Sequence, residues 1–167
     1  MEYGLSLGSN MGDRLHFLRR ARDLISTISG VLQIESSPVY ETAPVGVRSE
    51  YKDMEYLNAV LILDAESLPE DISKAIHAIE DTLGRVRTDD RFAPRPIDID
   101  ILYAGKTLSE SEDLMLPHPR WAERRFVVQP LADLRPDLIF PGDHSTVKSV
   151  LKTLPIEPAV RCYADDW

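Results

Sequence analysis

Cysteine, lysine and long apolar runs are scarce in this chain, and each scarcity excludes a class of protein. Its one cysteine, Cys162, cannot build a disulfide framework or a cysteine-rich metal site. No apolar run approaches the roughly 20 residues that cross a bilayer. The N-terminal residues lack the basic and apolar regions of a signal peptide. We therefore expect a cytoplasmic protein that does not enter a membrane.

The charge balance is acidic, with a formal net charge of −9 over 167 residues. This balance argues against a general affinity for nucleic acid or for anionic membranes. Positive charge is carried mainly by arginine, and half of the fourteen arginines fall in one stretch: Arg85, Arg87, Arg91, Arg95, Arg120, Arg124 and Arg125. A guanidinium matches phosphate oxygens, so the cluster suits a phosphate site. The alternative is a solvated charged surface.

The predicted elements follow the order strand, helix, strand, strand, helix, strand. The strands are expected at 2–7, 31–40, 56–63 and 97–103. One helix is expected at 14–29, and a second is opened by a capping box at Ser67 and Glu70 and ended by Gly84. A helix at 123–134, a strand at 138–140 and a helix at 146–154 follow. This order is typical of a ferredoxin-like α+β sandwich, in which helices cover one face of a mainly antiparallel sheet. We predict a single domain over residues 1–167.

One strand alternates isoleucine with aspartate and holds the clearest chemical signal. The isoleucines at 97, 99 and 101 point to one face of the sheet, and Asp98 and Asp100 share the other. Two carboxylates at this spacing can reach a pair of hard cations, as in two-metal phosphoryl chemistry. The alternative is the solvent-facing side of an ordinary strand.

Arg95 lies three residues before Asp98 and stands between two prolines, which restrict the backbone. An arginine held beside metal-binding carboxylates suits phosphoryl transfer, where positioning and charge neutralisation supply most of the catalysis. Alternatively, Arg95 neutralises the aspartates without a metal. His118 also stands between two prolines, and either a phosphate contact or packing of that corner would explain it.

The run Arg91–Leu102 resembles the signature of the 6-hydroxymethyl-7,8-dihydropterin pyrophosphokinases, which are enzymes of the folate pathway. Other similar segments occur in the family's order: Leu7–Asn10, Tyr40–Gly46, Tyr56–Val60, Gly84–Arg87, Leu116–Pro119, Arg124–Phe126 and Pro130–Leu131. Together they span most of the chain. The resemblance implies a ferredoxin-like fold, in agreement with the order of elements.

The resemblance also implies a reaction, in which ATP is the co-substrate and a diphosphate passes to the hydroxymethyl group of the pterin, leaving AMP. Two Mg²⁺ ions would be held by Asp98 and Asp100. The catalytic residues would be Arg85, Arg91, Arg95, Asp98 and Asp100. The residues around ATP would be His77, Glu80, Arg85, Arg87, Arg95, Ile101, His118 and Arg124.

For the acceptor, the resemblance implies a pterin held between the rings of Tyr56 and Phe126, an arrangement that suits a flat heterocycle. Asn58 and the backbone of 42–45 would pair with the amide edge of the pterin. The full set of substrate-binding residues would be Thr42, Pro44, Val45, Tyr56, Asn58 and Phe126. We expect a monomer.

Two other functions fit part of the pattern. A two-metal phosphohydrolase would also need Asp98, Asp100 and arginines, but it would not need an acceptor pocket. A non-enzymatic ferredoxin-like domain that binds a small ligand would not need two aspartates beside Arg95.

Overall fold

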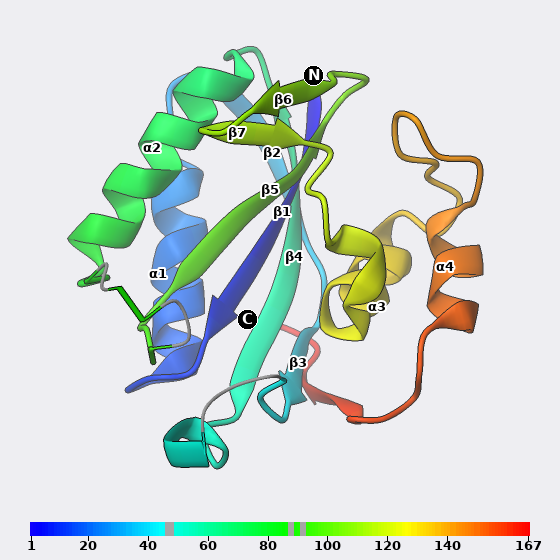
Figure 1. The fold of residues 1–167 in the computed structure, drawn as a ribbon. Helices are drawn as coiled ribbons and strands as arrows, with labels where there is room; N and C mark the ends of the chain where they lie inside the picture. Colours follow the sequence, from blue (N-terminus) through cyan, green and yellow to red (C-terminus); the bar gives the residue numbers. More distant parts are fainter. Residues whose placement is uncertain (46–48, 87–88, 91–92) are drawn as a thin grey trace.

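The computed structural model describes residues 1–45, 49–86, 89–90 and 93–167. Its centre is an antiparallel sheet in the order β5-β1-β4-β3-β8, with β2 also paired to β4 (Figure 1). The strands are β1 (Glu2–Ser9), β2 (Val31–Ser36), β3 (Val39–Thr42), β4 (Tyr56–Ala65), β5 (Asp98–Ala104) and β8 (Val160–Ala164). A separate hairpin joins β6 (Ser109–Ser111) to β7 (Leu114–Leu116). The helices are α1 (Arg14–Ile25), α2 (Pro69–Thr82), α3 (Arg125–Leu134) and α4 (Val147–Thr153).

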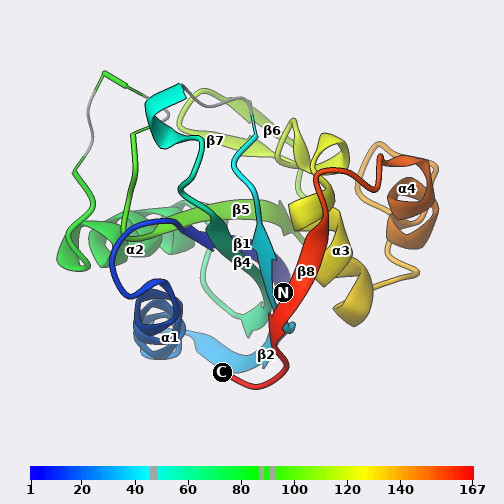
Figure 2. The ribbon, with the colours of Figure 1, turned by 90° about the horizontal axis from the view of Figure 1, so that it is seen from below.

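Helices lie on both faces of the sheet, whereas the sequence predicted helices on one face (Figures 1 and 2). The reason is visible in β4, which is apolar on both sides. Leu61 and Leu63 pack in one core with α1 and α2, while Val60 and Ile62 pack in a second core with α3. The order of the central strands is still that of a ferredoxin-like sandwich, so the predicted α+β class is confirmed.

The strand expected at 31–40 is in fact two strands, β2 and β3, which pair with successive parts of β4. The break falls at Ser37 and Pro38. The backbone N–H of Ser37 donates a hydrogen bond to the carbonyl of Val60 at 2.9 Å. The Ser37 hydroxyl accepts a hydrogen bond from the N–H of Val60, also at 2.9 Å. Pro38 has no N–H to continue the ladder. The chain therefore bends before it resumes pairing at Val39.

Other predictions of elements also need correction. The predicted capping box is wrong, because the N-cap of α2 is Leu68 and the hydroxyl of Ser67 bonds to the carbonyl of Ser29 instead (2.6 Å). The segment 138–140 forms one isolated bridge, between Ile139 and Thr146, rather than a strand. Strand β8 was not predicted. The C-terminal end of α2 agrees with the prediction, since Gly84 follows the helix with a φ of 88° that favours glycine, and α4 lies within the predicted range 146–154.

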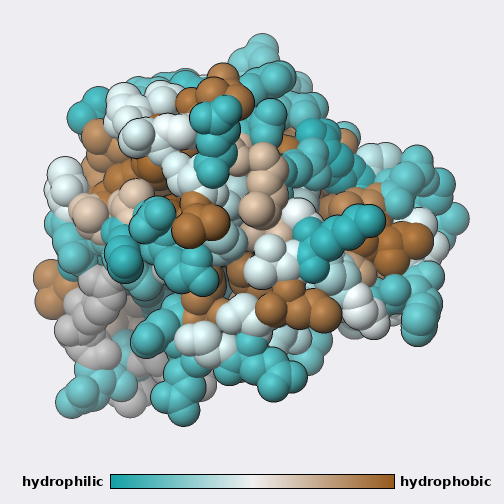
Figure 3. All heavy atoms as spheres, turned by 90° about the horizontal axis from the view of Figure 1, so that it is seen from above, coloured by the Kyte–Doolittle hydropathy of each residue, from teal (hydrophilic) through white to brown (hydrophobic). Residues whose placement is uncertain are grey.

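Among the described residues, no helix is both long and apolar enough to cross a membrane. On the face seen from above, apolar residues form separate groups among hydrophilic ones (Figure 3). Leu108 and Met115 of the hairpin region are examples of exposed apolar side chains.

Candidate active site

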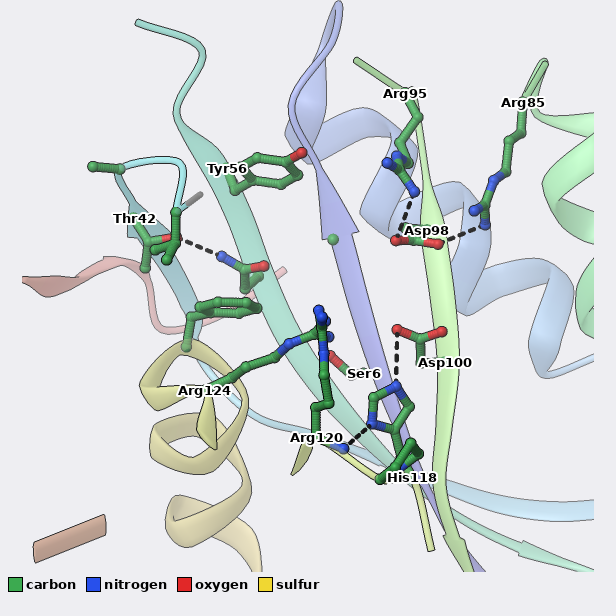
Figure 4. A pocket seen from close by; sticks show the side chains of 16 residues that line it. Ser6, Thr42, Tyr56, Arg85, Arg95, Asp98, Asp100, His118, Arg120 and Arg124 are labelled. Carbon is green, nitrogen blue, oxygen red and sulfur yellow. Dashed lines mark hydrogen bonds and ion pairs between the residues drawn. The ribbon is translucent and has the colours of Figure 1, made fainter. Parts of the chain in front are cut away.

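A cavity of about 520 Å³ lies where β1, β3, β4 and β5 meet the first turn of α3 (Figure 4). Side chains two apart in a strand share a face, and this alternation assembles the lining. Ser6 and Gly8 come from β1, Tyr56 and Asn58 from β4, and Asp98 and Asp100 from β5. We call the side of the cavity around β5 the charged wall; it includes Arg85, Arg95, Asp98 and Asp100. We call the side formed by β3, β4 and α3 the acceptor wall; it includes Thr42, Tyr56, Asn58 and Phe126.

Asp98 contacts two arginines of the charged wall. Its Oδ1 lies 2.6 Å from Nη1 of Arg85, and its Oδ2 accepts a hydrogen bond of 3.2 Å from Nη1 of Arg95 (Figure 4). The backbone of Arg95 is fixed by the buried Asn10, whose Oδ1 accepts from the Arg95 N–H at 2.9 Å. The backbone N–H of Asn10 donates to the Arg95 carbonyl at 3.3 Å. Arg95 is thus held beside Asp98.

Glu80 lies behind the charged wall and is only 1% exposed. It is absent from the described residues that line the cavity, although the resemblance placed it beside the nucleotide. Its carboxylate pairs with Arg85, and its Oε1 accepts a hydrogen bond of 2.8 Å from the N–H of Ile99. Burial alone would lower the pKa of Arg85, but Asp98 and Glu80 outweigh burial and raise it. Glu80 therefore orients Arg85 toward Asp98.

Asp100 shares the face of Asp98 but has no arginine within ion-pair distance among the described residues. Burial in the cavity, followed by the charge of Asp98, raises the pKa of Asp100 to about 7. Arg85, Arg95 and Arg120 act in the opposite direction. The side chain still exposes 42% of its surface. The carboxyl therefore lies deep in a cavity that is itself open to solvent.

His118 faces Asp100, with its Nε2 3.9 Å from Oδ2 of the aspartate (Figure 4). Its Nδ1 accepts a hydrogen bond of 3.1 Å from the backbone N–H of Arg120. Burial, followed by the charge of Arg120, lowers the pKa of His118, so the ring is neutral at neutral pH. Because Nδ1 is the acceptor, the neutral ring carries its proton on Nε2, the atom nearer Asp100.

Two further arginines, Arg120 and Arg124, extend into the cavity across from the aspartates (Figure 4). Among the described residues, neither guanidinium has a carboxylate within ion-pair distance. Arg124 lies over the ring of Phe126, 5.9 Å from its centroid. Their positive charge is therefore available to an anionic ligand.

The acceptor wall brings together most of the residues predicted to bind a pterin. Tyr56, Phe126, Thr42, Val45 and Asn58 all line the cavity. Thr42 and Asn58 are buried, and Nδ2 of Asn58 donates to Oγ1 of Thr42 at 2.8 Å. Aromatic rings beside a fixed amide group suit a flat heterocycle with hydrogen-bonding edges.

Gly8 keeps the acceptor wall open. A Cβ at this position would lie 3.3 Å from Oδ1 of Asn58 and 3.9 Å from Cδ1 of Tyr56. The first distance is tighter than most contacts of a real Cβ, so a larger residue would press on Asn58. The absence of a side chain at Gly8 therefore leaves room beside the amide.

Several lining residues were given no site role of their own from the sequence: Ser6, Gly8, Pro119 and Arg120, of which Arg120 was named only as a member of the arginine cluster. Ser6 is the cross-strand partner of Asp100 on β5. It also completes a G-x-S-x-G pattern, Gly4 to Gly8, which is typical of a nucleophile at a strand-to-helix turn. Ser6 instead lies in the middle of β1, so this pattern does not form that turn.

The remaining predicted residues are not among the described lining residues, or they lie outside the described part of the chain. His77 is exposed on α2. The side chain of Ile101 is in the core, 8% exposed, so only its backbone can reach a ligand. Pro44 is half-buried and is not among the described lining residues. Arg87 and Arg91 lie outside the described residues.

The donor set of the charged wall fits a magnesium ion that arrives with a nucleotide. No group of three or more potential metal ligands occurs in the part of the chain that the structure describes. Mg²⁺ commonly binds through one or two carboxylates, keeps waters and takes substrate phosphates as its other ligands. Asp98 and Asp100 offer that number of hard oxygen donors. A cation would also favour the ionised form of Asp100, which burial and the charge of Asp98 disfavour.

Comparison with known proteins shows which family the chain resembles. Residues 4–136 match the family model described as 7,8-dihydro-6-hydroxymethylpterin-pyrophosphokinase (HPPK). The 2-amino-4-hydroxy-6-hydroxymethyldihydropteridine pyrophosphokinase of Methylorubrum extorquens is 40% identical over 151 residues, which cover 90% of this chain and 91% of that protein. The Bacillus subtilis protein of the same name is 39% identical over 131 residues, covering 78% of this chain and 75% of that protein.

Some relatives are much longer than this chain. The folic acid synthesis protein fol1 of Schizosaccharomyces pombe is 36% identical over 96% of this chain, but the match covers 21% of that protein. The chain spans a similar share, 20%, of fol1 from Pneumocystis carinii. The chain thus corresponds to one part of these proteins.

Solved structures support the fold. An HPPK-DHPS structure in complex with substrates has a TM-score of 0.68 at 12% identity, over 91% of this chain and 43% of that chain. Wild-type HPPK-DHPS of Plasmodium falciparum with pteroate has a TM-score of 0.69 at 13% identity, over 90% and 44%. The family match and the two bacterial relatives together give the assignment: the chain belongs to the 7,8-dihydro-6-hydroxymethylpterin-pyrophosphokinase family, the pyrophosphokinases of folate synthesis.

Proposed function

We propose that the chain transfers the diphosphate of ATP to the hydroxymethyl group of 6-hydroxymethyl-7,8-dihydropterin, giving AMP and the pterin diphosphate. The observation that carries this proposal is the meeting of the charged wall and the acceptor wall in one cavity. A phosphohydrolase would need only the charged wall. A ligand-binding domain without catalysis would not need the aspartate pair beside Arg85 and Arg95.

The charged wall would bind the triphosphate. Arg120 and Arg124 lie across the cavity from Asp98 and Asp100, so phosphates between them would meet guanidinium groups on one side and metal-binding carboxylates on the other. Two Mg²⁺ ions held by Asp98 and Asp100 would neutralise charge on the phosphate oxygens. His118 is placed to donate a hydrogen bond from Nε2 to a phosphate oxygen.

The acceptor wall would hold the pterin so that its hydroxymethyl oxygen faces the β-phosphorus. The new bond forms between that oxygen and the β-phosphorus, and the bond to the α–β bridging oxygen breaks, which leaves AMP. The hydroxyl proton passes to solvent. Arg85 and Arg95 would stabilise the negative charge that spreads over the phosphate oxygens, and phosphoryl chemistry of this kind needs no strong base.

Stacking between Tyr56 and Phe126 would orient the pterin ring, and Asn58 would read its amide edge. The hydrogen bond from Asn58 to Thr42 fixes the amide before the pterin arrives. A site whose buried polar groups are left unpaired by the wrong ligand discriminates strongly. The acceptor wall would therefore select for the pterin's hydrogen-bonding edge.

The test is to incubate the protein with ATP, Mg²⁺ and 6-hydroxymethyl-7,8-dihydropterin and then to separate the nucleotides. AMP formed in step with a diphosphorylated pterin supports the proposal. ADP would mean transfer of the γ-phosphoryl group alone. Inorganic phosphate with unmodified pterin would mean a hydrolase.

We also propose that the protein acts in the cytoplasm as a monomer. Both walls of the cavity can be built from this one chain, and we expect the proposed reaction to need no second subunit. Sedimentation of the protein with and without substrates would test the oligomeric state, and a stable dimer would contradict this part.

A further inference from the structure

Four charged residues, Arg14, Glu41, Glu55 and Arg161, form a closed set of contacts that we call the clamp. Arg14 donates from Nη2 to Oε1 of Glu41 at 2.8 Å and from Nη1 to the backbone carbonyl of Glu55 at 2.9 Å. Arg161 donates from Nη2 to Oε1 of Glu55 at 2.9 Å and lies 3.7 Å from Oε2 of Glu41. Each arginine therefore links the two glutamates.

The clamp lies on the face of the sheet opposite the cavity. Glu41 and Thr42 are consecutive in β3, so their side chains point to opposite faces, and Thr42 lines the cavity. Arg14 is the first residue of α1, which packs on the other face. No clamp residue is found among the described residues that line the cavity. The clamp can therefore affect a bound substrate only through the backbone.

The two glutamates stand directly before two residues of the acceptor wall. Glu41 precedes Thr42, Glu55 precedes Tyr56, and Thr42 pairs with Tyr56 across β3 and β4. The clamp thus fixes the backbone at the point where both strands enter the cavity. The buried hydrogen bond between Asn58 and Thr42 depends on the same spacing.

One arm of the clamp comes from β8, which lies beyond the residues 4–136 matched by the family. Strand β8 pairs with β3, and Arg161 is the partner of Glu41. The far end of this segment is anchored by Trp167, whose Nε1 donates to the carbonyl of Ser37 at 2.7 Å. Without β8, the four-residue strand β3 would be an edge strand just before the acceptor loop.

We propose that β8 is a functional part of the acceptor wall, and that Arg14 and Arg161 are positioning residues for the pterin. Without the arginines, Glu41 and Glu55 would repel each other and Thr42 would shift relative to Tyr56. The ATP side of the cavity is built from β5 and other loops, so the clamp serves one substrate and not the other. This inference rests on the proposed function.

The test compares Arg161→Met and Arg14→Met with the unmodified chain. For each protein, the dissociation constant of 6-hydroxymethyl-7,8-dihydropterin is measured by direct titration. The KM is then measured for the pterin and for ATP. Arg161→Met removes an exposed ion pair, so we expect the dissociation constant and the KM for the pterin to rise by about two- to fivefold. Arg14→Met should give a larger rise, because the Arg14 side chain is 25% exposed against 61% for Arg161. The KM for ATP and kcat should stay unchanged.

Arg20→Met is the matched control, because it removes the same charge from an exposed position of α1. Arg161→Lys should recover part of the pterin affinity, and high salt should bring the unmodified chain closer to Arg161→Met. Equal changes in the constants for ATP and pterin, or a lower melting temperature with unchanged pterin binding, would overturn the inference. If the unmodified chain neither binds the pterin nor makes AMP, the proposed function fails and the inference falls with it.

Discussion

Asp98 and Asp100 share one face of β5, yet within the described part of the chain Asp98 pairs with two arginines and Asp100 with none. Asp98 lies 2.6 Å from Arg85 and 3.2 Å from Arg95, whereas Asp100 faces the neutral ring of His118, whose Nε2 lies 3.9 Å from its Oδ2. The pair is therefore asymmetric before any ligand binds. The ionised form of Asp100 is destabilised by burial and by the charge of Asp98, whereas the ionised form of Asp98 is stabilised by its two arginines.

This asymmetry predicts that Asp100→Asn stabilises the ligand-free protein at pH 8 without Mg²⁺. The folded state raises the pKa of Asp100 from 3.8 to about 7, so it favours the protonated carboxyl. As the pH rises from about 4 to 7, Asp100 loses its proton in the unfolded state but keeps it in the folded state, so the free energy of unfolding falls. Asparagine cannot ionise, so the melting temperature of the variant should exceed that of the unmodified chain increasingly over this range.

Asp98→Asn is the comparison for this first prediction. It leaves Arg85 and Arg95 without their shared carboxylate, so we expect no gain in melting temperature at pH 8. Adding Mg²⁺ and ATP should reverse the advantage of Asp100→Asn, because the proposed metal site needs both carboxylates and only the unmodified chain keeps them. An equal rise in melting temperature for both variants would contradict the asymmetry. A rise in the melting temperature of Asp100→Asn that is largest at pH 4 would also contradict it.

The second prediction concerns Glu80, which acts through Arg85. In Glu80→Gln the amide oxygen can still accept from the N–H of Ile99, but the ion pair with Arg85 is lost. We expect the free energy of unfolding to fall by about 1–3 kcal/mol. Because Arg85 loses its orientation toward Asp98, kcat should also fall while the KM for the pterin changes little. A variant with normal kcat would show that Glu80 is only structural.

The burial of Glu80 could have been predicted, because it follows Ile76 by four residues and so continues the apolar face of α2. The alternation in β5 likewise gave the correct placement of Asp98 and Asp100, since a period of two fixes which residues share a face. Predictions of this kind succeed because they depend on neighbours within one element.

Contacts between distant segments could not be predicted in this way. The pairing of β8 with β3 joins residues more than a hundred positions apart, and nothing in the local pattern of β8 selects its partner. The place of Arg120 depends on the turn after His118, which directs its side chain into the cavity. In contrast, the run Ala59–Leu63 of β4 is apolar without a break, so helices on both faces of the sheet could have been predicted from it.

A third prediction tests the open space beside Asn58. Gly8→Ala introduces a Cβ 3.3 Å from Oδ1 of Asn58, which must then move away from its place beside Tyr56. We expect the KM for the pterin to rise by roughly tenfold, since small misplacements at a binding wall are costly. The KM for ATP should change much less, because the added Cβ contacts only Asn58 and Tyr56 among the described residues, although Gly8 also pairs with Asp98 across β1 and β5. A parallel rise for both substrates would argue against this placement.

The fourth prediction concerns Arg120. Its side chain extends into the cavity, while its backbone N–H holds His118. Arg120→Met removes the guanidinium and leaves the backbone hydrogen bond intact. The dissociation constant for ATP should rise roughly ten- to hundredfold, as expected for loss of a hydrogen bond to a charged group. Arg19→Met on α1 removes an exposed charge away from the cavity and should leave ATP binding unchanged.

The most direct test of the account is the rate of AMP and pterin diphosphate formation in Asp98→Asn and Asp100→Asn, beside Asp137→Asn as a control. Asp137 is a surface carboxylate that pairs with Lys148 near α4. Both cavity variants should lose about a hundredfold or more in turnover while their circular dichroism stays native, because each lacks one of the two carboxylates proposed to hold the metal that would neutralise the phosphates. Asp137→Asn should keep full activity. Near-normal turnover in either cavity variant would contradict the claim that the two carboxylates of β5 are the centre of the site.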